Sequence, residues 1–450
     1  MIEKVKYKDS GFIFLGNIPE SWDTYRLKEL GYLQNGISKG GDYFGYGFPF
    51  VSYGDIYNDQ VESSKINGLA NSTKEDQKLY SVKAGDVFFT RTSETIDEIG
   101  ISSTCVSTIA KATFSGFTIR FRPTTSKLYK GFSKYFFKAH VNRLYLTKQI
   151  SLVTRASLGQ GILANLPVLI PPIDEQTQIA NYLDRKTQAI DKKAELLKQK
   201  IDKYKELRKS LINQTITKGL NRNIELKESG IEWIGKIPKH WEVKRLKDIG
   251  FLYSGLSGKS GDDFNQDENS DNRGFLPFTN IASNTYIDIE NFGKVIINKG
   301  EKQNKIKKHD IFFLMSSEGY EDLGKAALLI DDIPETYLNS FCKGFRITNN
   351  QVLPKYLNWM LFASVFRETL LVQGKGFTRI NLKMEKINDF EIILPTQDEQ
   401  KEIAQYLDTK TSLIDSIIAN IEKQMTGLAE LRKTLINDVV SGKLKVSGNS

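Results

Sequence analysis

The residue types that most often carry out chemistry are few in this chain and lie far apart. Its histidines are His140, His240 and His309, and its cysteines are Cys105 and Cys342. Acid–base catalysis, disulfide frameworks and zinc sites need such side chains in groups or at short spacing. We therefore predict no catalytic residues, no metal site and no cofactor bound by this chain.

One short motif resembles part of a nucleotide-binding loop. Gly258-Lys259-Ser260 matches the end of a P-loop, whose glycine backbone cradles phosphate. The first glycine of that motif would have to stand at position 253, which is Tyr253. We interpret the segment instead as a flexible loop with a basic tip.

Side chains that bind nucleic acid are more plentiful than catalytic ones. Lys, Arg, Ser, Thr, Asn and Tyr side chains in loops can contact phosphates and base edges. In the first half of the chain the candidates are Ser38, Lys39, Tyr43, Tyr46, Tyr53, Arg91, Thr92, Ser93, Thr154 and Arg155. In the second half they are Lys259, Ser260, Asn280, Ser283, Asn284, Ser316, Ser317, Lys375, Thr378 and Arg379. Each one alone also fits an ordinary loop, so the prediction rests on the group.

Composition supports an acidic partner and a folded protein. The 450 residues carry a formal net charge of +9, although excess lysine also keeps many proteins soluble. A hydrophobic content of 40% with 11% aromatic residues excludes a disordered chain, and a mean hydropathy of −0.37 is typical of a soluble protein. The charged N-terminus and the lack of a long apolar run indicate a cytoplasmic, reduced protein.

An internal duplication organises the chain. The segment 16–22 recurs at 235–241, and 174–213 recurs at 398–437 with 19 identities in 40 residues. Between these segments a sparser set of residues recurs at an offset of 224, including Asp86 as Asp310 and Phe117 as Phe341. Each half is therefore a variable domain followed by a constant segment.

The constant segments are predicted to be long helices. Asp174-Glu175 and Asp398-Glu399 follow prolines, where acidic residues favour a helix N-terminus more than they indicate catalysis. Apolar residues then recur every seven positions, a spacing typical of a coiled coil. They are Leu183, Ile190, Leu197, Tyr204 and Leu211 in the first helix, and Leu407, Ile414, Ile421, Leu428 and Leu435 in the second. Residues 174–218 contain 11 basic and 7 acidic side chains, and 398–443 contain 6 and 8. This difference suits pairing of the two helices, and equally an ordinary assortment of surface charge.

The variable domains are predicted to mix strands and helices. Short β-branched and aromatic runs at 86–90, 117–121, 310–314 and 325–330 indicate strands, and 132–149 and 355–372 indicate amphipathic helices. The expected fold class is α+β, with two mixed α/β domains joined by two long antiparallel helices in a pseudo-twofold repeat. The expected segments are 1–22 as a repeat boundary, 23–166, a spacer helix at 167–220, a linker at 221–241, 242–389, and a second spacer helix with tail at 390–450.

The duplicated motifs resemble those of type I restriction-modification specificity (S) subunits. The resemblance rests on two motif pairs, which cover essentially the whole chain in order. They are Ile18-Pro19-Glu20-Ser21-Trp22 with Ile237-Pro238-Lys239-His240-Trp241, and Ile170 to Gln176 plus Ile179 and Leu183 with Leu394 to Gln400 plus Ile403 and Leu407. Thr396 departs from the pattern by replacing the second proline of Pro171-Pro172, which should only adjust the path into the helix.

The resemblance implies a mechanism. Target-recognition domains at 23–166 and 242–389 would each read one half of a bipartite, asymmetric site in double-stranded DNA, and the paired helices would set the spacer. It also implies two modification subunits that use S-adenosylmethionine to methylate adenine, and restriction subunits that use ATP and Mg. The chain itself would be non-catalytic. A coiled-coil scaffold without DNA, and a specificity subunit of a methylation-only or other restriction system, remain the alternatives.

Overall fold

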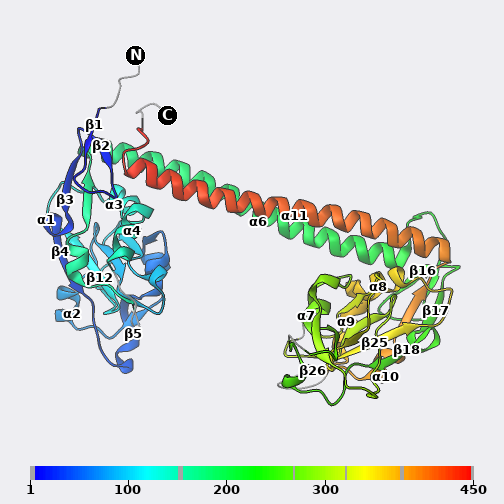
Figure 1. Ribbon diagram of the computed structural model, residues 1–450. Coiled ribbons are helices and arrows are strands. Elements are labelled where there is room, and N and C mark those ends of the chain that lie inside the picture. Colours follow the sequence, from blue (N-terminus) through cyan, green and yellow to red (C-terminus); the bar gives the residue numbers. More distant parts are fainter. Residues whose placement is uncertain (1–5, 150–155, 267–268, 320–321, 375–379, 447–450) are drawn as a thin grey trace. The chain divides into compact units, whose positions relative to one another are not determined.

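The computed structural model describes residues 6–149, 156–266, 269–319, 322–374 and 380–446 of a chain that forms two compact units. Unit 1 comprises Met1–Lys198 and Glu422–Ser450, and unit 2 comprises Gln199–Ile421. The long helices α6 (Ile173–Lys218) and α11 (Gln397–Val440) each contribute to both units. Every unit therefore contains one α/β domain and one part of each long helix (Figure 1).

The domain of unit 1 is built on a five-stranded sheet of order β4-β12-β8-β10-β6 and a three-stranded sheet of order β11-β5-β7. Its strands are β1 (Tyr7–Asp9), β2 (Asn17–Pro19), β3 (Asp23–Arg26), β4 (Gly31–Asn35), β5 (Phe44–Val51), β6 (Gln60–Val61), β7 (Leu69–Ala70), β8 (Val87–Thr90), β9 (Thr92–Ser93), β10 (Ser102–Cys105), β11 (Thr113–Phe114), β12 (Thr118–Pro123), β13 (Ala156–Ser157) and β14 (Pro167–Ile170). Its short helices are α1 (Leu27–Leu30), α2 (Lys74–Leu79), α3 (Lys130–Phe136), α4 (His140–Lys148) and α5 (Gln160–Ala164).

The domain of unit 2 repeats this plan with a four-stranded sheet of order β18-β25-β21-β23 and a three-stranded sheet of order β20-β19-β24. Its strands are β15 (Leu226–Glu228), β16 (Lys236–Pro238), β17 (Glu242–Arg245), β18 (Gly250–Ser254), β19 (Asn272–Leu276), β20 (Gly293–Ile296), β21 (Ile311–Leu314), β22 (Ser316–Ser317), β23 (Ala326–Leu328), β24 (Thr336–Leu338), β25 (Cys342–Ile347), β26 (Ile380–Asn381) and β27 (Glu391–Leu394). Its short helices are α7 (Phe278–Ser283), α8 (Pro354–Phe362), α9 (Ser364–Val372) and α10 (Met384–Asn388). The predicted α+β class is confirmed.

The central strand of each main sheet is buried on both faces, which explains its unbroken apolar sequence. In β8, Val87 and Phe89 belong to one hydrophobic cluster, and Phe88 belongs to another on the opposite face. In β21, Ile311 and Phe313 belong to one cluster. Phe312 and Leu314 belong to another on the opposite face. Successive side chains of a strand point to opposite faces, so only a sheet covered on both sides buries such a run.

An ion pair with a buried carboxylate links neighbouring strands of the main sheet at the same place in both units. The guanidinium of Arg122 donates two hydrogen bonds of 2.6 Å to Asp86, which is 1% exposed. Arg346 contacts Asp310 in the same way at 2.9 and 2.6 Å. These repeated residues are therefore structural, because each carboxylate is fully engaged inside the protein.

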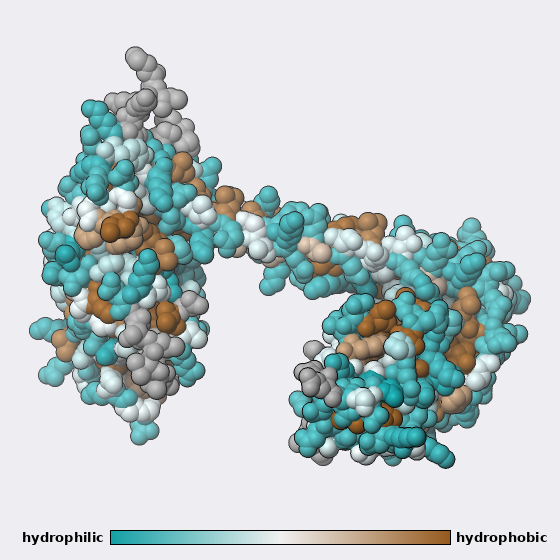
Figure 2. All heavy atoms as spheres, viewed as in Figure 1, coloured by the Kyte–Doolittle hydropathy of each residue, from teal (hydrophilic) through white to brown (hydrophobic). Residues whose placement is uncertain are grey.

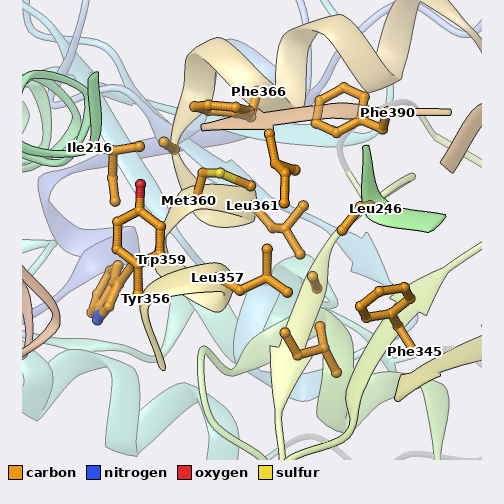
Figure 3. Packing of buried hydrophobic residues seen from close by; sticks show 14 of the residues in the cluster. Ile216, Leu246, Phe345, Tyr356, Leu357, Trp359, Met360, Leu361, Phe366 and Phe390 are labelled. Atoms are coloured by element: carbon orange, nitrogen blue, oxygen red, sulfur yellow. The ribbon is translucent and has the colours of Figure 1, made fainter. Parts of the chain in front are cut away.

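The largest core, in unit 2, joins the domain to the long helices. Tyr356, Leu357 and Met360 of α8 pack with Phe345 of β25, and Ile216 of α6 enters the same cluster (Figure 3). In unit 1, the helix residues Ile179 and Leu183 of α6 and Ile436 and Val439 of α11 enter the core in the same manner. The long helices are thus part of each domain's core.

The amphipathic stretches of the two domains are each broken into two helices. The predicted helix at 132–149 is divided into α3 and α4, and that at 355–372 into α8 and α9, because the ψ angles of Ala139 and Ala363, 142° and 135°, are not helical. The break leaves backbone N–H groups at the start of the second helix. Asn437 of α11 accepts the one from Val141 at 3.1 Å, and Asn213 of α6 accepts the one from Ser364 at 2.9 Å. The long helices therefore cap the domain helices.

The helices run antiparallel in each unit. The start of α6 packs with the end of α11 in unit 1, and the end of α6 packs with the start of α11 in unit 2 (Figure 1). All ten residues of the predicted seven-residue pattern are buried or half-buried.

The strands that precede the helices belong to the domains. β14 pairs with β3, and β27 pairs with β17. These strands lie within the segments 167–220 and 390–450, for which the sequence indicated spacer helices.

The helices are fixed to the domains by the glutamine of each repeated Asp-Glu-Gln motif. The side chain of Gln176 is fully buried; it accepts the N–H of Tyr129 at 2.8 Å and donates to two backbone carbonyls. Gln400 does the same, accepting the N–H of Leu353 at 2.8 Å.

Candidate nucleic-acid interface

The predicted DNA-contacting loops of unit 1 meet at one end of the main sheet. β4 and β8 end where β12 begins, since Asn35 pairs with Ile119 and Thr90 with Thr118. Beyond these ends the N–H of Gly116 donates to Ile37 at 2.8 Å, and the N–H of Arg91 donates to Phe117 at 3.0 Å. Three loops from distant parts of the sequence are thereby held together.

A glycine allows the loops to approach so closely. A Cβ atom at Gly36 would lie 2.3 Å from the backbone oxygens of Phe114 and Ser115. At the corresponding Gly255 of unit 2 it would lie 2.1 Å from the oxygen of Asn339. Any larger residue would separate the strand end from the turn. These glycines were not predicted, although a glycine directly after a strand in both halves was a signal for them.

The candidates Ser38 and Lys39 are exposed in the loop after β4, and the Lys39 ammonium lies 5.7 Å from the centre of the Tyr43 ring. The Tyr43 hydroxyl donates to Asp76 at 2.9 Å, and burial together with this bond raises the pKa of Tyr43. Tyr46 is 54% exposed on β5 and accepts a bond from Asn71. Lys39 and Tyr46 are thus accessible, whereas Tyr43 is held by the domain.

Three further candidates share one pocket. Tyr53, Thr92 and Ser93 line a space of about 230 Å³ together with Glu94, Glu98 and Phe117. The Ser93 hydroxyl bonds to Glu98, and Ser93 itself is largely buried. Hydroxyl and carboxylate groups can bond with base edges, the carboxylate with the amino group of cytosine. Arg91, beside the pocket, donates to the carbonyl of Gly116 at 3.4 Å.

The corresponding site of unit 2 contains Ser316 and Ser317 on β22. This strand pairs with β26, as β9 pairs with β13 in unit 1. Ser316 is half-buried, and Ser317 is largely buried and accepts the N–H of Gly319. Ser260 and Ser283 are exposed.

Two candidates of unit 2 require correction. Asn280 is 4% exposed, and its amide bonds to the backbone of Asp288 and Asn291 and to Asn284. Asn280 therefore holds the turn after α7 together, with the half-buried Asn284 as its partner. It does not offer a free contact.

Lys259 is the second correction. Its side chain is 5% exposed and donates to Glu301 at 2.7 Å, and Asp263 lies at 3.8 Å. The hydrogen bond from Lys259 lowers the pKa of the Glu301 carboxyl. The expected basic loop tip is thus an internal ion pair, because two acidic residues nearby neutralise the ammonium.

Five candidates, Thr154, Arg155, Lys375, Thr378 and Arg379, lie outside the described residues.

Within the described ranges, no three His, Cys, Asp or Glu side chains are grouped as metal ligands. No helix among those residues has the length and apolar character needed to cross a membrane.

The chain was compared with known proteins. The family model described as type I restriction modification DNA specificity domain matches twice, at residues 19–204 and 238–426. The type I restriction enzyme MjaIX specificity subunit of Methanocaldococcus jannaschii is 25% identical over 448 residues, which cover 96% of this chain and 95% of the relative.

Two solved structures share the fold. One, from work on complex assembly and conformational transition of the type I R-M system, has a TM-score of 0.73 at 12% identity and covers 95% of this chain and 99% of its own. An HsdS subunit from Thermoanaerobacter tengcongensis has a TM-score of 0.56 at 13% identity and covers 95% and 98%. Because the two matches include both domains and most of both long helices, the chain belongs to the type I restriction-modification DNA specificity domain family and contains that domain twice.

Proposed function

We propose that this chain is the DNA-reading subunit of a type I restriction-modification complex, and that each domain reads one half of a bipartite site. The duplication carries the proposal. Both domains bring the same loops to the same end of the same sheet, yet the residues on those loops differ. Three residues after Gly36, for example, the loop of unit 1 presents the exposed Lys39, whereas Gly258 stands three residues after the equivalent Gly255 in unit 2. Different side chains on a common frame predict an asymmetric site.

The proposed complex assigns the chemistry to other chains. Two modification subunits would carry S-adenosylmethionine and methylate adenine, and restriction subunits would use ATP and Mg to translocate and cut DNA in the cytoplasm. This chain would be non-catalytic and would direct both activities to a sequence. Its family supports this division of labour.

The helices are proposed to set the distance between the half-sites. Asp191 of α6 pairs with Arg432 of α11 at 2.9 Å, and Arg208 of α6 pairs with Asp415 of α11 at 3.1 Å. These pairs fix one antiparallel register, in which 192–198 lie opposite 425–431. Deleting both heptads together would leave both ion pairs in register and shorten the helices by roughly 10 Å.

The experiment is methylome sequencing of a host that carries the complex with this double deletion. A shortening of roughly 10 Å corresponds to about three base pairs at about 3.4 Å per pair, so the spacer should shrink while both half-sites keep their sequence. Deleting only 192–198 is the matched control and should disrupt the pairing. An unchanged spacer would contradict the proposal that the helices set the distance between the half-sites.

A domain exchange tests the assignment of half-sites. Replacing 242–389 with the corresponding domain of another specificity subunit should change one half-site only. A change in both would contradict independent reading. The affinity of this chain for DNA is expected to fall steeply as the salt concentration rises, whereas a coiled-coil scaffold would have no affinity for DNA.

A further inference from the structure

Phe117 and Phe341 occupy the same place in the two domains and are both exposed. Phe117 is 63% exposed and Phe341 48%, and neither belongs to a hydrophobic cluster of its unit. The residues immediately after them, Thr118 and Cys342, are buried as the first residues of β12 and β25. Packing of the domain cores therefore does not explain why both halves carry phenylalanine.

The backbone holds both rings in the same turn. The N–H of Phe117 donates to the Ser115 hydroxyl at 3.2 Å, and that of Phe341 donates to the Asn339 side chain at 2.8 Å. Their carbonyls accept the N–H groups of Arg91 at 3.0 Å and Met315 at 3.2 Å. A backbone that is already held on both sides loses little conformational freedom when the residue binds a ligand.

The surroundings of Phe117 point to DNA as that ligand. The ring is one wall of the pocket that includes the predicted contacts Tyr53 and Thr92. The preceding Gly116 lies against Ser38, so the loop after β4 reaches the same place. The visible faces of both units are mainly hydrophilic, with hydrophobic residues in small separate patches (Figure 2). The exposed Lys39 of the loop after β4 and the hydroxyl groups of Tyr53 and Thr92 suit the phosphates and base edges of DNA.

The identity of the two residues indicates what the contact does. The domains are proposed to read different sequences, so a side chain common to both cannot distinguish bases. Apolar side chains inserted between base steps unstack and bend DNA with little regard to sequence. We propose that Phe117 and Phe341 each act as a wedge that stacks against one unstacked base step, one in each half-site. This inference rests on the proposed function.

The test uses the full chain with its modification subunits and a duplex that this complex selects from a random pool. 2-Aminopurine is placed at each position of the half-sites in turn. In the unaltered complex, the adenine that the modification subunits methylate should brighten because those subunits extrude it. One further position in each half-site should brighten as its base unstacks beside the phenylalanine. Phe117→Ala should abolish this further brightening in one half-site only, and Phe341→Ala in the other. Each should weaken binding by roughly 5- to 150-fold, as expected for loss of one stacked aromatic ring.

Controls separate the wedge from other roles. Phe117→Trp should retain binding and brightening. Leu79→Ala in unit 1 and Ile289→Ala in unit 2, at side chains that are 57% and 39% exposed, should change neither. The thermal midpoint of every variant is measured, and the exposed rings predict little change.

Three outcomes overturn the proposal. The first is that Phe117→Ala and Phe341→Ala bind the duplex as tightly as the unaltered complex. The second is that the variants bind more weakly but no base beside a phenylalanine brightens in the unaltered complex. The third is that either variant selects a different base. If the complex selects no duplex at all, the proposed function fails instead.

Discussion

Arg432 joins a long helix to a domain, because its guanidinium donates to Asp59 at 2.8 Å while it also bonds Asp191 of α6 at 2.9 Å. The corresponding Arg208 of unit 2 pairs with Asp415 and lies over the ring of Phe362 at 5.1 Å. Both arginines thus connect the helix pair to a domain, one through a second carboxylate and the other through an aromatic ring.

Arg432→Ala is expected to destabilise unit 1 by about 1 kcal/mol, since two partly exposed ion pairs are lost. Burial raises the pKa of Asp59, but Lys138 and Arg432 outweigh it and lower the pKa overall. The variant should therefore also lose part of the stability that Asp59 contributes above about pH 4, which disappears as the pH falls through its lowered pKa. Urea unfolding at pH 7 and at a pH well below 4 measures both effects.

Arg208→Ala is the matched control, because it changes the equivalent residue of unit 2 and leaves Asp59 unaffected. Arg432→Lys should lose part of the stability, since a lysine cannot span both carboxylates in the same way. Equal stability of Arg432→Ala and the unaltered chain at pH 7 would contradict the bridging role.

The sequence predicted the architecture well because the repeat and the sevenfold spacing are properties of many residues at once. The structure bears out the strands around Phe88 and Phe312 and the helices α6 and α11. Details that depend on one distant contact were not predictable. The break at Ala139 is one, because the N–H groups it leaves are capped by Asn437, almost 300 positions away.

The candidate interface shows the same division. The candidate loops of unit 1 converge at one end of the main sheet. That their side chains contact DNA stays a prediction. Lys259 was misread because its partner Glu301 lies 42 positions further on and no local pattern connects them. Phe117 and Phe341 were recognised as repeated, but their exposure could not be derived, since a phenylalanine beside a strand is usually buried.

Asp86→Ala is expected to cost about 3–5 kcal/mol of unfolding free energy, because it leaves the guanidinium of Arg122 poorly compensated in a largely buried place. Urea denaturation of the full chain measures the loss. Glu62→Ala, at a more exposed pair with Lys65, is the control and should cost less than about 1 kcal/mol. Similar losses for both variants would show that the buried pair has no special role.

Cys105 and Cys342 provide one thiol reporter for each unit. Both are buried, and desolvation raises the pKa of each thiol to about 12. At pH 8 the native thiols should therefore react with a disulfide reagent orders of magnitude more slowly than in urea, where the pKa returns to about 8.5. Cys342→Ser leaves a reporter for unit 1, and Cys105→Ser leaves one for unit 2. Rapid labelling of either variant in buffer alone would contradict the burial.

Glu399 should make unit 2 sensitive to acid. Burial raises the pKa of its carboxyl, but hydrogen bonds from His240 at 2.8 Å, Thr396 at 2.9 Å and Trp241 at 3.4 Å outweigh this and lower it. A lowered carboxyl pKa contributes stability above the unfolded value of about 4.3, and this contribution is lost as the pH falls through the folded value.

Glu399→Gln should therefore reduce the stability of unit 2 at pH 6 by roughly 1 kcal/mol and flatten its decline between pH 5 and pH 3. Tryptophan fluorescence against urea concentration reports mainly unit 2 at each pH, because Trp233, Trp241 and Trp359 lie in that unit. Glu175→Gln is the matched control, because the corresponding Trp22 in unit 1 has a buried ring N–H with no hydrogen-bond partner among the described residues. An equally steep acid decline in Glu399→Gln and the unaltered chain would place the acid-sensitive group elsewhere in unit 2.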